Sequence, residues 1–231
     1  MPRVPRGLII EEGFQTHKMW RSHNREWNIS ESDEKEAYLN ELNDELKKKH
    51  QTNELNALTL MSNHTHELFH INDKIEFSNM MRTHHSRYGM YFNQKHKRRG
   101  KVAYERPKTC LIEDDQYSMT ATFYIHANPV KAGITKNAAN YRWSTHKLYA
   151  FGKYEKFMKY VVFPRWYMDL GKSWPERQRK YRTLFDAYLR EMGLIKQAFL
   201  HGYFYGDHLW MLELSKKVLE WRKKSRSKDP P

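Results

Sequence analysis

The sequence has very little cysteine and no long apolar run. Cys110 is the only cysteine among 231 residues, which excludes a disulfide within the chain and a zinc site built from cysteines, and favours a reducing compartment. No apolar run approaches the roughly 18 residues that a membrane helix needs. The N-terminal run Leu8-Ile9-Ile10 is too short for a signal peptide. We therefore expect a cytoplasmic protein with no membrane span.

Acidic residues are few relative to basic ones. The chain has 41 Lys and Arg against 27 Asp and Glu, which gives a net charge of +14 and a pI near 9.7. This surplus favours a polyanionic partner, with nucleic acid first and an anionic membrane surface second. A soluble protein that is merely basic is the other alternative. Aromatic residues make up 14% of the chain, and several adjoin basic ones, as in Trp20-Arg21, which suits stacking on unpaired bases.

The first 150 residues alternate between strand-like and helix-like patterns. The sequence predicts strands or extended segments over 7–25, 57–70 and 102–111, and helices over 32–49, 75–94 and 116–127. Pro129 has no N–H and disfavours helix at the preceding residue, so the third helix should end or kink near Asn128. This order predicts an α+β fold, with helices on one face of a mainly antiparallel sheet, and resembles the ferredoxin-like split β-α-β pattern.

The composition changes after about residue 150. Tryptophans and tyrosines lie among charged residues, and helical periodicity returns over 175–192 and 207–224. We predict a domain over 1–150 and a mostly helical, basic extension over 151–231, with a possible DNA-binding role. The basic tail, 221–231, is expected to be disordered.

Two histidines separated by one residue stand at the centre of the predicted buried strand. Successive side chains on a strand point to opposite faces, so His64 and His66 share one face, while Thr65 and Glu67 share the other. Two imidazoles so placed can bind one metal ion, or one can bind while the other orients a phosphate. In a chain with 13 histidines, a chance pair is the alternative.

Tyr124 and Asn128 are one helical turn apart and share a face of the third helix. A phenolate can attack phosphorus and form a phosphotyrosine, and a divalent cation can neutralise the phosphate oxygens. The Asn128 amide oxygen could complete a Mg²⁺ or Mn²⁺ site with the two histidines. The alternative is that Tyr124, one of 15 tyrosines, packs in the core.

A dense basic run lies between the second helix and the next extended segment. Residues 95–101 read KHKRRGK, and a loop this dense on a basic protein is expected to contact phosphates. The candidate DNA-binding residues are Arg21, Arg25, Lys97, Arg98, Arg99, Lys101 and Arg106.

Several motifs, in order, resemble one protein family. MSNHTH at 61–66 resembles the M-P-N-H-x-H strand of the HUH single-strand transposases. YIHANPVKAGI at 124–134 closely resembles the Y-I-x-x-N-P-V-R-A-G segment of REP-associated tyrosine transposases, relatives of the insertion-sequence-200-like transposases. Residues 14–27 resemble the family's first strand and R-x-x-N-R turn, 100–106 its glycine-to-arginine stretch, and YRWS at 141–144 its Y-x-W-S-S segment. The resemblance covers about residues 7–150.

The resemblance implies a ferredoxin-like catalytic domain with a tyrosine nucleophile. It implies a divalent metal, Mg²⁺ or Mn²⁺, held by His64, His66 and Asn128, with Tyr124 attacking. Members cleave single-stranded DNA, often beside a hairpin, leave a 5′-phosphotyrosine and a free 3′-hydroxyl, and rejoin strands by the reverse reaction without nucleotide hydrolysis. Some are monomers and some homodimers, and we expect one of these states.

Two positions depart from the family pattern. Ser62 stands where proline is usual, and Glu67 stands where an apolar residue is usual. Glu67 faces away from the metal if the strand is regular, whereas a bulge would bring its carboxylate in.

Two further functions are also compatible with these residues. One is a domesticated protein that binds hairpin or single-stranded DNA without cutting it. The other is a metal-dependent phosphohydrolase that uses water on the same metal and forms no covalent adduct.

Overall fold

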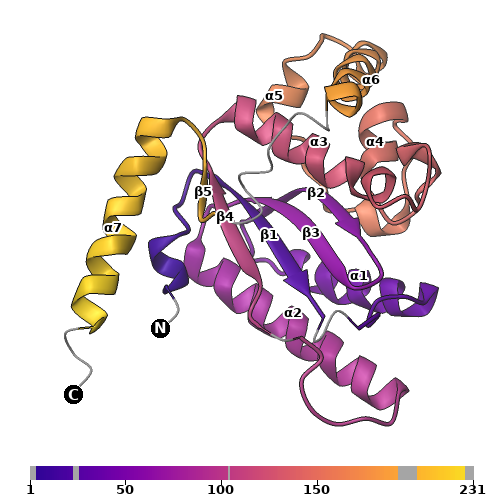
Figure 1. Cartoon of the computed structure of the whole chain (residues 1–231). Coiled ribbons are helices and arrows are strands. Elements are labelled where there is room, and N and C mark those ends of the chain that lie inside the picture. Colours follow the sequence, from indigo (N-terminus) through magenta and orange to yellow (C-terminus); the bar gives the residue numbers. More distant parts are fainter. Residues whose placement is uncertain (1–3, 23–25, 104, 192–201, 227–231) are drawn as a thin grey trace.

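A five-stranded sheet forms the centre of the computed structural model, which describes residues 4–22, 26–103, 105–191 and 202–226 (Figure 1). The strands are β1 (Gln15–Arg21), β2 (Glu54–Leu60), β3 (His64–His70), β4 (Lys108–Ile112) and β5 (Phe204–Tyr205). Their spatial order is β2-β3-β1-β4-β5, with antiparallel neighbours except that β5 runs parallel to β4. The first four strands therefore have the ferredoxin-like order, and the predicted α+β fold is confirmed.

The single strand predicted over 57–70 is wrong, because the chain reverses within it. β2 and β3 form an antiparallel hairpin, and the Met61 N–H donates to the His64 carbonyl at 2.8 Å. Ser62 and Asn63 lie at the reversal, and both residue types favour turns. The apolar residues on either side concealed this turn in the sequence.

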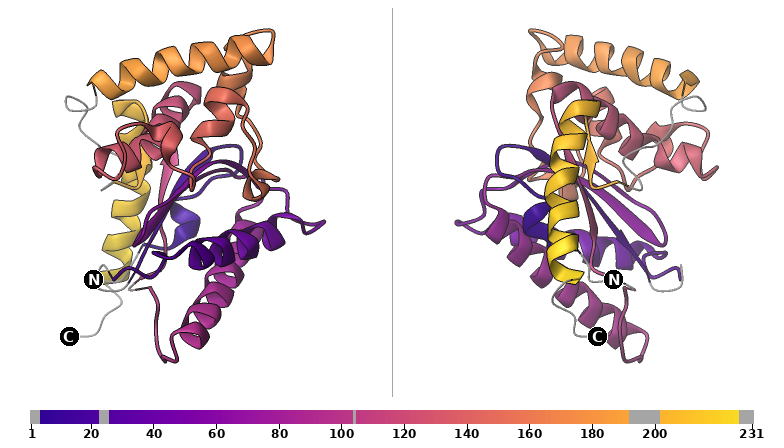
Figure 2. Two further views of the ribbon diagram at one scale, coloured as in Figure 1. Left: turned by 90° about the vertical axis from the view of Figure 1, so that its right-hand side faces the viewer. Right: turned by 60° about the vertical axis from the view of Figure 1, so that its left-hand side comes forward.

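Helices α1 (Ser32–Leu46) and α2 (Lys74–Lys95) lie together on one face of the sheet (Figure 2). The Glu34 carboxylate accepts from the N–H groups of Ser30 and Glu31 at the start of α1. Asp73 precedes α2 and caps it by accepting from the N–H groups of Ile75 and Glu76 in the first turn. The two helices and this face enclose a core whose buried members include Trp20, Tyr38, Leu39, Phe69, Phe77 and Tyr88.

Helix α3 (Asp115–Lys131) crosses the opposite face, so helices cover both faces rather than the one face that was predicted (Figure 2). Asp114 caps its first turn. The predicted end or kink near Asn128 is wrong, since the helix continues through Pro129 to Lys131. Pro129 is close to the end of the helix, where one missing N–H interrupts little of the remaining ladder. Gly133, at φ 70°, then reverses the chain.

The residues after 150 pack against the rest of the chain. Helix α6 (Trp174–Glu191) places Tyr181, Phe185 and Tyr188 against Phe123 of α3. Helix α7 (His208–Arg226) lies beside β5 at the β4 side of the sheet. The shorter helices are η1 (Arg6–Leu8), η3 (Ala138–Asn140), α4 (His146–Phe151), η4 (Lys156–Met158) and α5 (Arg165–Met168). The two-domain division at 150 stays a prediction. The predicted disorder of the tail is wrong for residues 221–226, which continue α7, and residues 227–231 lie outside the described residues.

Segments from later in the chain border both edges of the sheet. At the β2 edge, the Leu60 N–H donates to the Trp143 carbonyl, and the Val162 N–H donates to the Leu55 carbonyl, both at 2.9 Å. At the other edge, β5 pairs with β4, and the Leu111 N–H donates to the Tyr203 carbonyl at 2.8 Å. Within the described residues, no helix is long and apolar enough to cross a membrane.

A fully buried ion pair joins β1 to β3 beneath α1. Lys18 Nζ donates to Glu67 Oε2 at 2.7 Å and to the Tyr38 hydroxyl at 3.0 Å. The Tyr38 hydroxyl donates to Glu67 Oε1 at 2.6 Å, and Thr65 Oγ1 donates to the same oxygen at 3.0 Å. Burial acts to raise the pKa of Glu67, but the Lys18 charge and these hydrogen bonds outweigh it and hold the pKa low. Glu67 thus faces away from the histidines, as predicted for a regular strand.

Removing one partner of this pair should destabilise the fold strongly. We expect Glu67→Gln to lower the free energy of unfolding by about 3–5 kcal/mol, because it leaves the Lys18 ammonium buried without its counter-charge. The double variant Lys18→Met/Glu67→Leu should recover most of this loss, since both charges are then gone. Urea denaturation measures both.

An exposed ion pair provides the control for this prediction. Lys180 and Glu176 are 2.8 Å apart on α6, and Lys180→Met should cost less than about 1 kcal/mol. If Glu67→Gln were as stable as this control variant, the buried ion pair would not make the expected contribution to the free energy of unfolding.

Candidate active site

The two histidines of the H-x-H motif lie on the face of β3 that α3 covers. Their ring centroids are 4.9 Å apart. His66 is buried and His64 is half-buried at the start of the strand. The structure therefore brings both imidazoles to one place, at the end of the sheet where β3 begins.

Helix α3 carries Tyr124 to this histidine pair. The centroid of its ring is 5.4 Å from that of His66, in an edge-on arrangement. The neighbouring residues Phe123 and Ile125 are buried and fix the rotation of the helix against the sheet. Tyr124 is itself only 4% exposed. The predicted nucleophile and the predicted metal ligands thus adjoin one another.

Asn128 lies on the same side of α3, one turn after Tyr124. Its Nδ2 donates to the Tyr124 carbonyl at 2.9 Å, which ties the amide to the helix. The amide oxygen is the atom that could bind a cation. Within the described residues, no cluster of three or more His, Cys, Asp or Glu side chains could hold a metal ion. The ligand set of two imidazoles and this amide therefore stays a prediction.

The hydrogen bonds of the two histidines suit them for metal binding. His64 Nδ1 donates to Asn63 Oδ1 at 2.6 Å, since that oxygen can only accept. Burial and the Arg21 charge lower the pKa of His64 to about 4 and that of His66 well below its usual value, so both rings are neutral near pH 7. A neutral His64 that donates from Nδ1 keeps a lone pair on Nε2, as a metal ligand must. The donor set therefore fits a divalent cation such as Mn²⁺.

His17 was missed by the sequence analysis. It lies on β1, its Nε2 is 2.9 Å from His66 Nδ1, and the two rings stack with centroids 5.1 Å apart. A ligand histidine is usually oriented by a partner on its other ring nitrogen, and His17 occupies that position for His66. Strand alternation places His17 on the face of Arg21, but only the pairing of β1 with β3 brings it to His66.

Two cations influence the Tyr124 side chain. Arg21 is paired with His64 across the β1–β3 ladder, and Lys131 Nζ lies 5.5 Å from the centroid of the Tyr124 ring. Burial raises the pKa of Tyr124 to about 12, while an Asn128 hydrogen bond and the Arg21 charge act in the opposite direction. Positive charge is therefore the means available here to stabilise a phenolate. Lys131 was also missed, because it comes two helical turns after Tyr124.

The other predicted DNA-binding residues are spread over the surface. Lys97, Arg99 and Lys101 are exposed in the loop after α2. Arg98 is held to the protein, with Nη1 3.4 Å from Glu26 Oε2 and its guanidinium over the Phe92 ring. Arg25 lies outside the described residues.

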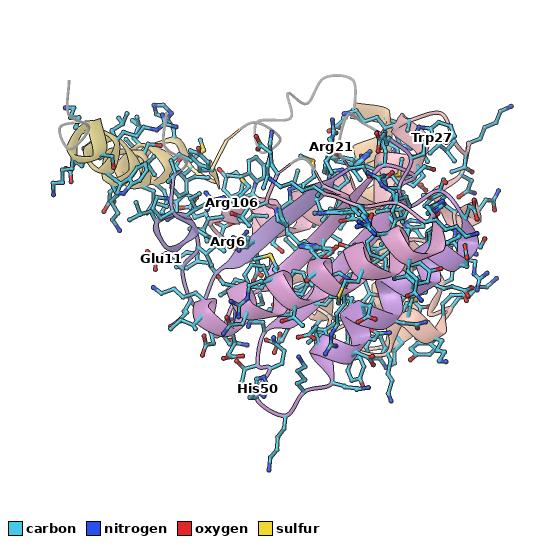
Figure 3. All side chains as sticks on the ribbon, turned by 90° about the horizontal axis from the view of Figure 1, so that it is seen from below. Arg6, Glu11, Arg21, Trp27, His50 and Arg106 are labelled. Atoms are coloured by element: carbon cyan, nitrogen blue, oxygen red, sulfur yellow. The ribbon has the colours of Figure 1, made fainter. Side chains whose placement is uncertain are left out.

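Arg106 lies apart from that loop, at the other end of the segment that leads into β4. It donates to the Val4 carbonyl and lies beside Arg6, between α7 and the sheet (Figure 3). The structure thus places Arg21 at the histidine site, Lys97, Arg98, Arg99 and Lys101 in the loop after α2, and Arg106 in the segment before β4.

Comparisons with known proteins agree with this arrangement of elements. Residues 11–128, just over half of the chain, match the family model described as "Transposase IS200 like". The chain therefore belongs to the IS200-like transposase family. A REP-associated tyrosine transposase, solved bound to a REP hairpin, matches with a TM-score of 0.51 and 20% identity, over 63% of this chain and 84% of that one. At this identity the likeness shows a shared fold. No curated protein matches.

Replacing His17 tests its role in orienting His66. We expect His17→Phe to weaken Mn²⁺ binding by about 10- to 100-fold, because the imidazole of His66 loses the partner that fixes it. Isothermal titration calorimetry without DNA measures this directly. His50→Phe is the control, since His50 is exposed and pairs at 3.5 Å with Glu76 instead. Equal Mn²⁺ affinity for both variants would rule out an orienting role.

Proposed function

We propose that this chain cleaves and rejoins single-stranded DNA, with Tyr124 as the nucleophile and a 5′-phosphotyrosine as the intermediate. The observation that carries the proposal is the position of the Tyr124 ring beside His66 and His64. Membership of the IS200-like transposase family supports it. His64, His66 and Asn128 are the proposed ligands of a divalent cation, Mg²⁺ or Mn²⁺.

The proposed chemistry exchanges one ester for another. The phenol oxygen of Tyr124 forms a bond to the scissile phosphorus, the bond from phosphorus to the 3′-oxygen breaks, and that oxygen takes up a proton as the phenol loses one. When bound, the metal supplies positive charge that neutralises the phosphate oxygens. Because the phosphate remains esterified, attack by a 3′-hydroxyl on the phosphotyrosine reverses the reaction without an external energy source.

Residues of this chain contribute positive charge of their own. The proposed role of Arg21 and Lys131 is to bind the non-bridging oxygens of the phosphate and to stabilise the phenolate, which the Lys131 contact with the Tyr124 ring and the Arg21 charge near Tyr124 support. His17 is a positioning residue, because it contacts His66 rather than the substrate.

The proposed substrate is DNA that carries a hairpin. A net charge of +14 supports a polyanionic partner, and the transposase that shares the fold was solved with a REP hairpin. One observation favours a second candidate function, hairpin binding without cleavage: Tyr124 is 4% exposed and therefore shielded from a phosphate. Formation of a covalent protein–DNA adduct distinguishes cleavage from binding without cleavage.

The decisive test is a covalent protein–DNA adduct that depends on Tyr124. With labelled single-stranded hairpin DNA and Mn²⁺, the wild-type chain should give a shifted band on a denaturing gel, and Tyr124→Phe should give none, because it lacks the attacking oxygen. Tyr117→Phe is the control, since Tyr117 is on the same helix but packs against Tyr205.

Three outcomes of the adduct experiment are informative. An adduct with Tyr124→Phe would show that another residue is the nucleophile. Binding without any adduct, unaffected by a chelator, would favour the non-catalytic function. Metal-dependent cleavage without an adduct would favour hydrolysis by water.

The exposed basic loop should contribute to affinity but not to sequence preference. We expect the triple variant Lys97→Gln/Arg99→Gln/Lys101→Gln to weaken binding of all DNA sequences alike. It should also reduce the slope of log K against log salt by roughly one unit per lost phosphate contact. Fluorescence anisotropy across a salt series measures the slope. The control variant removes three exposed lysines elsewhere, Lys153, Lys156 and Lys159. If the loop variant had the same slope of log K against log salt as the wild type, the loop would not contact phosphates.

A further inference from the structure

We infer that a cleft between β1, β4 and the C-terminal segment 202–226 binds single-stranded DNA next to the active site. Its volume is about 590 Å³, within the range of roughly 300–1,000 Å³ that is typical of ligand sites. The inference rests on the proposed function in one respect: it assigns the place where the strand continues from the scissile phosphate.

The charged side chains in the walls of the cleft are mostly basic. Arg106, Lys108 and Arg222 line it, together with one acidic residue, Glu105. Arg6 adjoins this group, and burial together with the Arg106 charge lowers its pKa to about 10. Like charges are thus held together at the cost of mutual repulsion, which an anion such as a phosphate relieves.

An anchored aromatic side chain also lines the cleft. Tyr203 is 36% exposed, yet its carbonyl accepts from the Leu111 N–H at 2.8 Å. Its hydroxyl is 3.5 Å from Nη2 of Arg222. The residue that follows, Phe204, is buried and fixes the backbone further. An exposed ring on a fixed backbone, surrounded by cations, is the combination that binds unpaired bases.

The cleft adjoins the active site through His17. His17 lines it, and His17 Nε2 is 2.9 Å from His66 Nδ1. Met19, which pairs with His66 across the ladder, lines it as well. A strand whose phosphate contacts Tyr124 can therefore extend along β1 and β4 toward Tyr203.

The far wall of the cleft comes from outside the family match. Gly202, Tyr203 and Arg222 all follow residue 128, where that match ends. The cleft therefore gives the C-terminal segment a role in holding the substrate strand, in addition to its packing against the sheet.

The test compares hairpins with and without single-stranded flanks, bound to the full chain in EDTA. With flanks of about six thymidines on both sides, Tyr203→Ala should lower affinity roughly ten-fold, the usual effect of losing one stacked base. Affinity for the blunt hairpin should change less than about two-fold. Lys108→Gln should reduce the salt slope for the flanked hairpin by about 0.7.

Matched variants outside the cleft control for general effects. Tyr154→Ala removes an equally aromatic but exposed ring, and Arg179→Gln removes an exposed charge on α6. Both should bind the two hairpins as the wild type does. Equal losses of Tyr203→Ala on flanked and blunt hairpins, or no loss on either, would overturn the inference.

Cross-linking tests the cleft without any substitution. Ultraviolet irradiation of the wild-type chain with flanks that carry 5-iodouracil should give a cross-linked peptide containing Tyr203, identified by mass spectrometry. Cross-links confined to peptides outside the cleft would overturn the inference even if Tyr203→Ala failed to fold.

The adduct assay, run in parallel, separates this inference from the proposed function. If the wild-type chain forms the adduct and Tyr203→Ala binds the flanked hairpin as tightly as the wild type does, the cleft inference alone is wrong. If Tyr203→Ala loses affinity for the flanked hairpin but no hairpin gives an adduct, the proposed catalysis is wrong and the cleft remains a binding site.

Discussion

The pairing of β1 with β3 is the constraint on which the site depends. Lys18 lies opposite Glu67 in this ladder, and their ion pair is buried beneath α1. A slip of one residue would turn every side chain of β3 to the other face, so it would exchange the histidines with Glu67. Because separating the buried charges is costly, the pair on one face fixes the register that presents His64 and His66 on the other.

The helix that carries Tyr124 is held from the C-terminal half of the chain. His126 Nδ1 is 2.6 Å from the Tyr181 hydroxyl of α6, and its Nε2 is 2.7 Å from Thr145 Oγ1. Phe123 packs against Tyr181 on the same side. The residues on either side of Tyr124 in α3 thus anchor the helix from behind, while Tyr124 itself faces the sheet. Rigid support of this kind is what a reacting side chain requires.

The sequence predicted the site residues that local periodicity governs. Alternation placed His64 and His66 together, and helical spacing placed Asn128 with Tyr124. What it could not supply depended on tertiary pairing: His17 reaches His66 only through the strand register, and Lys131 reaches Tyr124 through two turns of a helix expected to end earlier. The hairpin at Ser62 was hidden because apolar residues continue on both sides of it. The C-terminal strand β5 was missed because it has only two residues.

The segments that border the two edges of the sheet also restrict how copies of this chain can associate. Backbone groups of β2 are already bonded to residues 143 and 162, and β4 is bordered by β5. Within the described residues, these contacts already use some of the edge N–H and C=O groups that joining two sheets into one requires. A partner strand that paired with β2 or β4 at these edges would therefore first have to displace segments of the same chain.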